Sequence, residues 1–323
     1  MLTAAVTGEL FAAVALLLFS VNIILTKIAA ARLNLNLGFL VSVSVNVLFA
    51  GLLFFIQLAW REDRVLWHPE GFYLFVLAGA CSTYLGRWFF LESVVRFGPT
   101  RASIFQITSP LFAALLAWAF LRETLQPLEL AGMGLAIGGL LLVIPVPGAS
   151  SKLPLSEEVA AQGAEAASLS AAKNGSRRWL QSAWLLGVGS SFAYALGNIF
   201  RGAAIRNWDE ALLGALIGAS GGLVLHALFS QDKKQLPGKF KNADRRGMVL
   251  FAISGVLTIS AQTCLILSLK YIPVSVAALI TLCTPVLVFP MSYLLLKNSE
   301  KITPPTLLGG ALTLTGVALI LVT

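Results

Sequence analysis

Ten apolar runs, each about as long as a membrane-spanning helix, constrain this chain more than any other feature of its sequence. They cover approximately residues 8–31, 37–60, 71–96, 99–121, 126–147, 180–204, 209–230, 247–270, 273–296 and 304–323. A helix needs about 20 mostly apolar residues to cross the hydrocarbon core. Charged residues make up only 12% of the chain, about half of what soluble domains carry. Because lipid offers the backbone no hydrogen-bond partners, helices are expected rather than open strands. The sequence therefore predicts an all-α, polytopic membrane protein of ten transmembrane helices.

One long polar segment divides these ten runs into five and five. Residues 148–178 are rich in Ala, Ser, Gly and Glu, a composition typical of a flexible linker. We therefore expect a first five-helix unit at 1–147, the linker at 148–178 and a second five-helix unit at 179–323.

Basic residues are distributed unevenly over the connections. The loop 231–246 carries six Lys and Arg against two Asp. Beside two membrane spans, such a cluster indicates contact with anionic lipid headgroups rather than with nucleic acid. Counted near the helix ends, fifteen Lys and Arg fall on the side of the linker and five on the side of the termini. The positive-inside rule then predicts a cytoplasmic linker and both termini outside.

The two halves of the chain are similar in sequence. At an offset of 175 residues, the run at 98–110 aligns with 273–285, so that Pro110 meets Pro285. After a two-residue insertion, Glu123 meets Glu300 at an offset of 177, and upstream Asn22 meets Asn198 at 176. Matched mid-span prolines and post-span glutamates indicate an internal repeat.

Two five-span copies in series must lie in opposite orientations, because five is an odd number. Such inverted-topology repeats are characteristic of secondary transporters. They allow inward-open and outward-open states to be related by exchange of the conformations of the two halves. The sequence therefore predicts transport by alternating access.

The repeated segments resemble a known family. Residues 98–144 combine Pro110 with Arg122, Glu123 and Thr124 after the span and several glycines in the next helix, and residues 273–322 repeat this arrangement with Pro285, Glu300 and Gly316. Both segments are similar to EamA domains, and the ten spans resemble the drug/metabolite transporter superfamily. This resemblance implies a helix bundle around a central cavity and export of small metabolites, often amino acids. It also implies cytoplasmic termini, the opposite of what the charge count predicts.

Arg87 is the polar residue placed deepest in any predicted span. It lies nine residues before the end of its run, roughly 13 Å deep at 1.5 Å per residue. Its repeat partner is Gln262, and Tyr84 lies one turn away. Since a guanidinium suits carboxylate or phosphate, Arg87 is a candidate anchor for an anionic group of the substrate. The alternatives are a structural Arg satisfied by backbone carbonyls or Glu92, and a gating contact.

Other polar residues within the spans have more than one interpretation. Asn22, Asn198, Asn46 and Gln106 either line the cavity or hydrogen-bond helices to one another. Glu92 precedes Arg96 by four residues, so an ion pair explains it. Lys27 and Arg201 lie within about a turn of the predicted helix ends and are expected to snorkel. Pro110 and Pro285 are expected to kink their helices and to act as hinges.

Several function classes lack the residues that they require. The chain shows no metal-ligand spacing, no phosphate-binding loop and no cofactor motif, so we expect neither a metal nor a cofactor. A non-transporting scaffold or receptor and a membrane-embedded enzyme remain as alternatives. We expect a monomeric secondary transporter for a small molecule, embedded in the lipid bilayer and in the inner membrane if the chain is bacterial. A proton or a counter-substrate is a candidate coupling partner.

Overall fold

The structure is a computed structural model, and all the elements that it describes are helices. It describes residues 4–61, 65–97, 99–106, 183–229, 240, 243–272, 274–295 and 304–322, together with a few positions between 108 and 142. The predicted linker 148–178, most of the predicted span 126–147 and Pro110 lie outside the described residues.

The first half of the chain contributes helices that follow the predicted spans closely. They are α1 (Ala4–Ala30), α2 (Leu35–Trp60), α3 (Pro69–Ala78), the π-helix η1 (Gly79–Gly86), α4 (Arg87–Phe97) and α5 (Pro99–Gln106). The elements α3, η1 and α4 run on without a break, so they form the third predicted span. Its first turn is capped by His68, whose Nδ1 accepts from the amide of Gly71 at 3.2 Å.

The second half repeats this order. It contains α9 (Ala183–Asn207), α10 (Ala211–Phe229), α12 (Arg245–Tyr271), α13 (Val274–Leu282), α14 (Thr284–Leu295) and α15 (Pro304–Val322). The predicted span 273–296 is divided at Cys283, just before Pro285. Because proline lacks an N–H and clashes with the preceding turn, the break falls where the kink was predicted.

Five of the described helical segments are long and apolar enough to cross a membrane. They are α1, α2, the continuous stretch Pro69–Arg96, α10 and α12. Leu48, Phe55 and Leu294 are more than half exposed, an arrangement that suits a surface facing lipid. The chain is thus an integral, multi-pass membrane protein.

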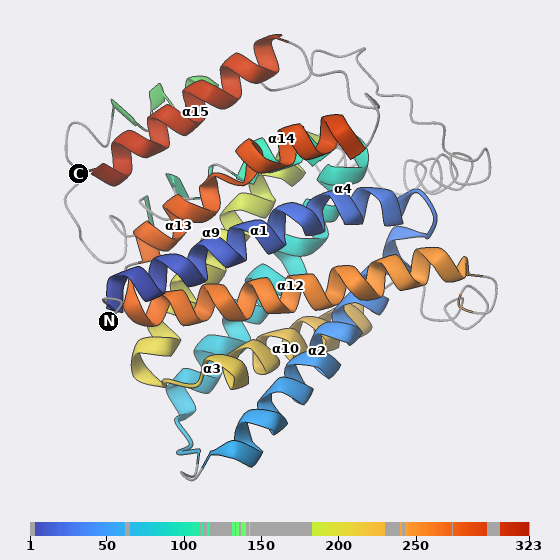
Figure 1. The fold of residues 1–323 in the computed structure, drawn as a ribbon, viewed down its shortest axis with the longest axis vertical. Helices are drawn as coiled ribbons and strands as arrows, with labels where there is room; N and C mark the ends of the chain where they lie inside the picture. Colours follow the sequence, from blue (N-terminus) through green and yellow to red (C-terminus); the bar gives the residue numbers. More distant parts are fainter. Residues whose placement is uncertain are drawn as a thin grey trace.

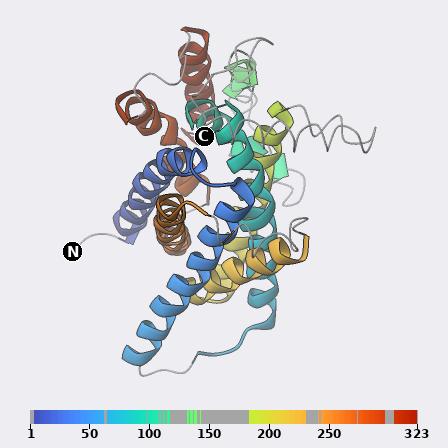
Figure 2. The same ribbon diagram turned by 90° about the vertical axis from the view of Figure 1, so that its right-hand side faces the viewer.

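The third helix of each half packs mainly on the first two helices of the other half. Both ribbon views show α1 beside α12 (Figures 1 and 2). Asn22 and Thr26 of α1 approach Ser254 near the start of α12, whereas Gly8 approaches Ile272 just after its end. The helices α1 and α12 are therefore antiparallel, and contacts between the two halves form much of the core.

Close contacts across the halves occur in matched pairs. A Cβ added to Gly38 would lie 2.3 Å from the Phe251 ring, and one added to Gly214 would lie 2.3 Å from the Phe75 ring. Gly214 and Phe251 each lie 176 residues after Gly38 and Phe75. The two halves therefore use equivalent residues to pack on each other.

A second matched pair brings backbones together. A Cβ on Gly79 would lie 2.3 Å from the carbonyl oxygen of Gly218, and one on Gly255 would lie 2.5 Å from that of Ser42. These positions are again 176 residues apart. Small residues allow such close approach of membrane helices.

The second helices of the two halves run in opposite directions where they touch. The Phe39 ring of α2 lies 4.5 Å from the His226 ring near the end of α10. Further along α2, a Cβ on Gly51 would lie 3.8 Å from Leu216 near the start of α10. Since α2 and α10 hold equivalent places in the two halves, their antiparallel contact bears on the orientation of the repeats.

Candidate functional site

Arg87 lies at the junction of η1 and α4, with only 3% of its surface exposed. Its Nη2 donates to Ser42 Oγ at 2.5 Å. With the Asn46 amide oriented to satisfy its neighbours, Asn46 Oδ1 accepts from Nη1 at 2.8 Å. The guanidinium carbon is 6.0 Å from the centre of the Phe39 ring, within cation–π range. The partners of Arg87 are thus neutral groups of α2, rather than Glu92 or backbone carbonyls.

Asn46 connects this arginine to the second half of the chain. In the same orientation its amide nitrogen donates to the carbonyls of Gly255 at 2.7 Å and Ser42 at 2.9 Å. Asn46 is fully buried, and Gly255 belongs to α12. The hydrogen-bond network around Arg87 therefore joins the two repeats.

Arg201 is a second buried guanidinium, and the prediction that it snorkels is wrong. Only 4% of it is exposed, because α9 continues to Asn207 and packs along η1. Its Nη2 donates to Ser82 Oγ at 2.5 Å and its Nη1 to Asn198 Oδ1 at 3.2 Å. Arg201 therefore joins α9 to the π-helix.

The same prediction is wrong for Lys27, which is 5% exposed. Its Nζ donates to the carbonyls of Val94 at 3.2 Å and Val95 at 3.1 Å. These are among the last four carbonyls of α4, which have no partner within the helix. Lys27 therefore caps α4, and its charge suits the negative end of the helix dipole.

Tyr194 of α9 lies between the two arginines along the same face of η1. A Cβ on Gly86 would come within 3.3 Å of its ring, so the absence of a side chain there lets Tyr194 pack close to η1. Its phenol is within electrostatic range of both guanidiniums. One turn earlier in α9, Ser190 Oγ donates to the Gly86 carbonyl at 2.9 Å.

The remaining predicted polar residues divide into three groups. Gln106 donates to Ser190 Oγ at 2.8 Å, which connects α5 to the Gly86 contact. Asn22 accepts from Ser254 Oγ at 2.6 Å and so holds α1 to α12. Gln262 is buried in α12, and none of the hydrogen bonds between described residues joins it to Arg87.

Tyr84 belongs to an aromatic cluster around His226. Its ring centre is 6.4 Å from that of His226, and Trp88 lies 5.7 Å from the same imidazole. His226 is 3% exposed, which agrees with a structural role. Glu92 bonds Arg96 at 3.0 Å across one helical turn, so the predicted ion pair is confirmed.

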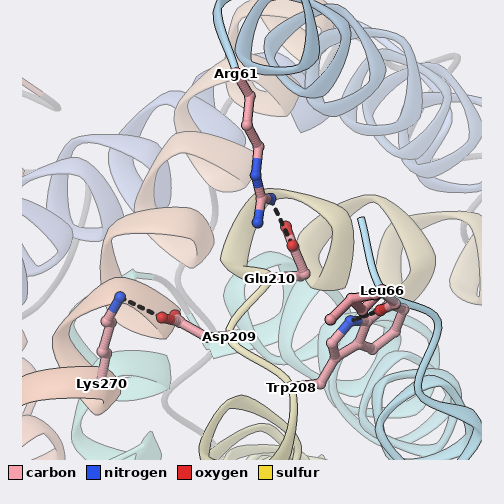
Figure 3. A network of polar contacts seen from close by, with 6 residues as sticks. All are labelled: Arg61, Leu66, Trp208, Asp209, Glu210 and Lys270. Carbon is pink, nitrogen blue, oxygen red and sulfur yellow. Dashed lines mark hydrogen bonds and ion pairs between the residues drawn. The ribbon is translucent and has the colours of Figure 1, made fainter. Parts of the chain in front are cut away.

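A separate polar cluster lies at one end of the bundle (Figure 3). Arg61, just after α2, bonds Glu210, just before α10, at 2.5 Å. Trp208 Nε1 donates to the Leu66 carbonyl at 2.9 Å, and Lys270 pairs with Asp209. The Arg61 and Trp208 contacts tie the two repeats together at this end.

The other described link of this type is weaker. Arg32 and Asp244 are 3.6 Å apart, and both side chains are more than a third exposed. Over the described ranges, His, Cys, Asp and Glu side chains form no group of three that could hold a metal ion. The chemistry available at the buried site is therefore that of guanidinium, amide and hydroxyl groups, which bind and orient a ligand.

Comparisons with known proteins agree with this architecture. The profile described as the EamA-like transporter family matches residues 6–144 and 181–322. A solved crystal structure is 15% identical, with a TM-score of 0.57 over 97% of this chain and 94% of that one. At that identity the likeness concerns the fold alone. No curated protein matches the chain.

Proposed function

Since the chain belongs to the EamA-like transporter family, a family of membrane transporters of small molecules, we propose that it is a secondary transporter that exports small metabolites such as amino acids or related amphipathic compounds. The observation that carries this proposal is the buried hydrogen-bond network of Arg87, Ser42, Asn46 and Gly255, which joins the two repeats inside a lipid-embedded bundle. Polar groups are costly within a membrane and commonly mark the path of a substrate.

Alternating access between two inverted repeats is the mechanism that we propose. The antiparallel contact of α2 with α10 supports opposite orientations, as does the matched packing of Gly38 on Phe251 and Gly214 on Phe75. Equivalent interfaces of this kind can exchange conformations, so that each half takes the role that the other had.

The ion pair Arg61–Glu210 is a candidate gate at one end of the pathway. Glu210 is 5% exposed, whereas Arg61 is about a third exposed, so the pair lies at a boundary between protein and solvent. The weaker Arg32–Asp244 link suits an opposite end that opens more easily. We propose that the Arg61 pair breaks when the repeats rock, with Pro285 and its counterpart Pro110 as hinges.

Transport by purified protein tests the proposal. The chain would be reconstituted into proteoliposomes loaded with a mixture of metabolites, and efflux would be followed by mass spectrometry. We expect a subset of the mixture to leave faster than from protein-free vesicles. We also expect Asn46→Ala to slow that efflux, whereas Gln57→Ala, an exposed amide on the same helix, should leave it unchanged. If no compound leaves faster than from empty vesicles, the transport proposal fails.

Accessibility labelling tests the inverted orientation. In a cysteine-free background, single cysteines at Arg32 and Asp209 would report on the loops between the first two helices of each repeat. A membrane-impermeant maleimide should label one of the two from outside and the other only after permeabilisation. Labelling of both from the same face would contradict the inverted arrangement.

A further inference from the structure

We propose that Arg87 and Arg201 together form a two-guanidinium site that binds a carboxylate or phosphate group of the transported substrate. This inference names the substrate class of the transporter proposed above and rests on that function. It assigns a ligand-binding role to Arg201 and describes a site shared by η1, α2 and α9.

Charge balance is the first argument. Among the described residues, the charged side chains with less than a tenth of their surface exposed are Lys27, Arg87, Arg201 and Glu210. Lys27 caps the end of α4, and Glu210 is bonded to Arg61. The hydrogen-bond partners of Arg87 and Arg201 are hydroxyl and amide groups. Two buried cations without a described carboxylate partner favour an anion, because burial of an unpaired charge is costly.

Unused donors are the second argument. A guanidinium carries five N–H donors, and the described hydrogen bonds of each arginine run from two nitrogens to two acceptors. Further donors of each fork are therefore available to carboxylate or phosphate oxygens, which guanidinium groups bind in pairs. The hydroxyl of Thr83 in η1 is also buried and lacks a partner among the described residues.

The π-helix brings the two arginines to one region. The amide of Arg87 bonds the Ser82 carbonyl, so Arg87 lies one π-turn above the serine that receives Arg201. Tyr194 packs on Gly86 between them, and it is partly exposed, as is Asn198. A ligand beside Tyr194 would therefore face both positive charges.

Only one repeat carries this pair of charges. The counterpart of Arg87 is Gln262 at an offset of 175, and that of Arg201 is Leu25 at 176. The second repeat thus has neutral residues at the equivalent positions. The charges point to a single anion site rather than to two symmetric ones.

Binding measured apart from transport tests the inference. The full chain would be placed in phosphatidylcholine nanodiscs and titrated calorimetrically with inorganic phosphate, succinate or choline. We expect at least one of the anions to bind and choline not to bind. Arg87→Gln and Arg201→Gln should each weaken anion binding roughly 10- to 100-fold, as expected for loss of hydrogen bonds to a charged group. Arg246→Gln removes an exposed positive charge from α12 and should bind as the unmodified chain does.

Several outcomes would overturn the inference. Absence of phosphate and succinate binding by the unmodified chain would do so, whether or not the variants fold. Anion affinity unchanged in both folded variants would do so as well. If phosphatidylglycerol in the nanodiscs abolishes binding, a lipid headgroup occupies the site and the assignment to substrate fails. Efflux of only neutral or cationic metabolites, unaffected by either substitution, would refute the anion site while leaving the transporter proposal intact.

Discussion

Replacement of Gly79 by alanine should separate the two repeats where their backbones are closest. The added Cβ would lie 2.3 Å from the Gly218 carbonyl oxygen and 2.6 Å from its Cα. An ordinary carbon–oxygen contact is about 3.3–3.6 Å, so η1 and α10 would have to move apart by about 1 Å. The obstacle is the backbone of a neighbouring helix, so a side-chain rotation cannot relieve it.

The same interface offers a control with the opposite expected sign. A Cβ on Gly221 would lie 3.8 Å from the Val76 carbonyl, an ordinary contact. Overpacking of a well-packed core costs about 1–3 kcal/mol, so we expect Gly79→Ala to destabilise the fold by at least that amount. Replacement of glycine by alanine within a helix gains about 0.5–1 kcal/mol, so Gly221→Ala should be neutral or slightly stabilising. The two variants should differ by roughly 2 kcal/mol or more.

Unfolding by sodium dodecyl sulfate, followed by circular dichroism in mixed micelles, would measure this difference. Gly255→Ala should resemble Gly79→Ala, because its Cβ would meet the Ser42 carbonyl at 2.5 Å. Equal stability of the Gly79 and Gly221 variants would show that the repeats do not meet in the way described here.

Three further expectations follow from other contacts. Glu210→Gln should lower the free energy of unfolding by about 1–3 kcal/mol, and a double-mutant cycle with Arg61→Gln would show whether the ion pair is the cause, since independent effects would simply add. Lys27→Met should speed hydrogen exchange at residues 94–97, because it leaves the Val94 and Val95 carbonyls uncapped; unchanged protection would contradict the capping role. Deletion of Cys81 should turn η1 into a regular α-helix and abolish the phosphate or succinate binding expected above, whereas Cys81→Ala should retain it; anion binding by a folded deletion variant would separate the site from the π-helix.

Helix positions could be predicted well from the sequence because the bilayer imposes a length and an apolar composition on each span. The predicted runs 37–60 and 247–270 correspond to Leu35–Trp60 and Arg245–Tyr271, and the break at Cys283 lies beside the proline that predicted a kink. The site was less predictable. Arg87 was identified from its depth, but its partner Ser42 was not, since a lone serine in an apolar run gives no sign of which helix it faces.

Lys27 and Arg201 show why distance from a helix end is a poor measure of exposure. Lys27 does lie three residues before the end of α1, yet the end of α4 covers it. Arg201 lies six residues before the end of α9, and η1 covers it. Snorkelling requires an open path to the interface, and whether such a path exists depends on neighbouring helices rather than on the local sequence. An unexplained cation within a few turns of a predicted helix end would have been the available signal.

The π-helix explains a small irregularity in the repeat that the sequence alone leaves without a cause. Contacts at Gly79 and Gly255 match at an offset of 176, whereas Ser93 and Ser268 match at 175. The first repeat therefore has one extra residue between 79 and 93, and η1, at Gly79–Gly86, lies in that interval. A π-helix accommodates an inserted residue within a continuous helix, and such segments frequently occur at functional sites. Two repeats that exchange conformations need equivalent packing at their ends, but a substrate has no two-fold symmetry. A single inserted residue beside Ser82 and Arg87 meets both requirements, since it leaves the matched glycine contacts in register while giving one repeat alone the local geometry that holds the charged side chains.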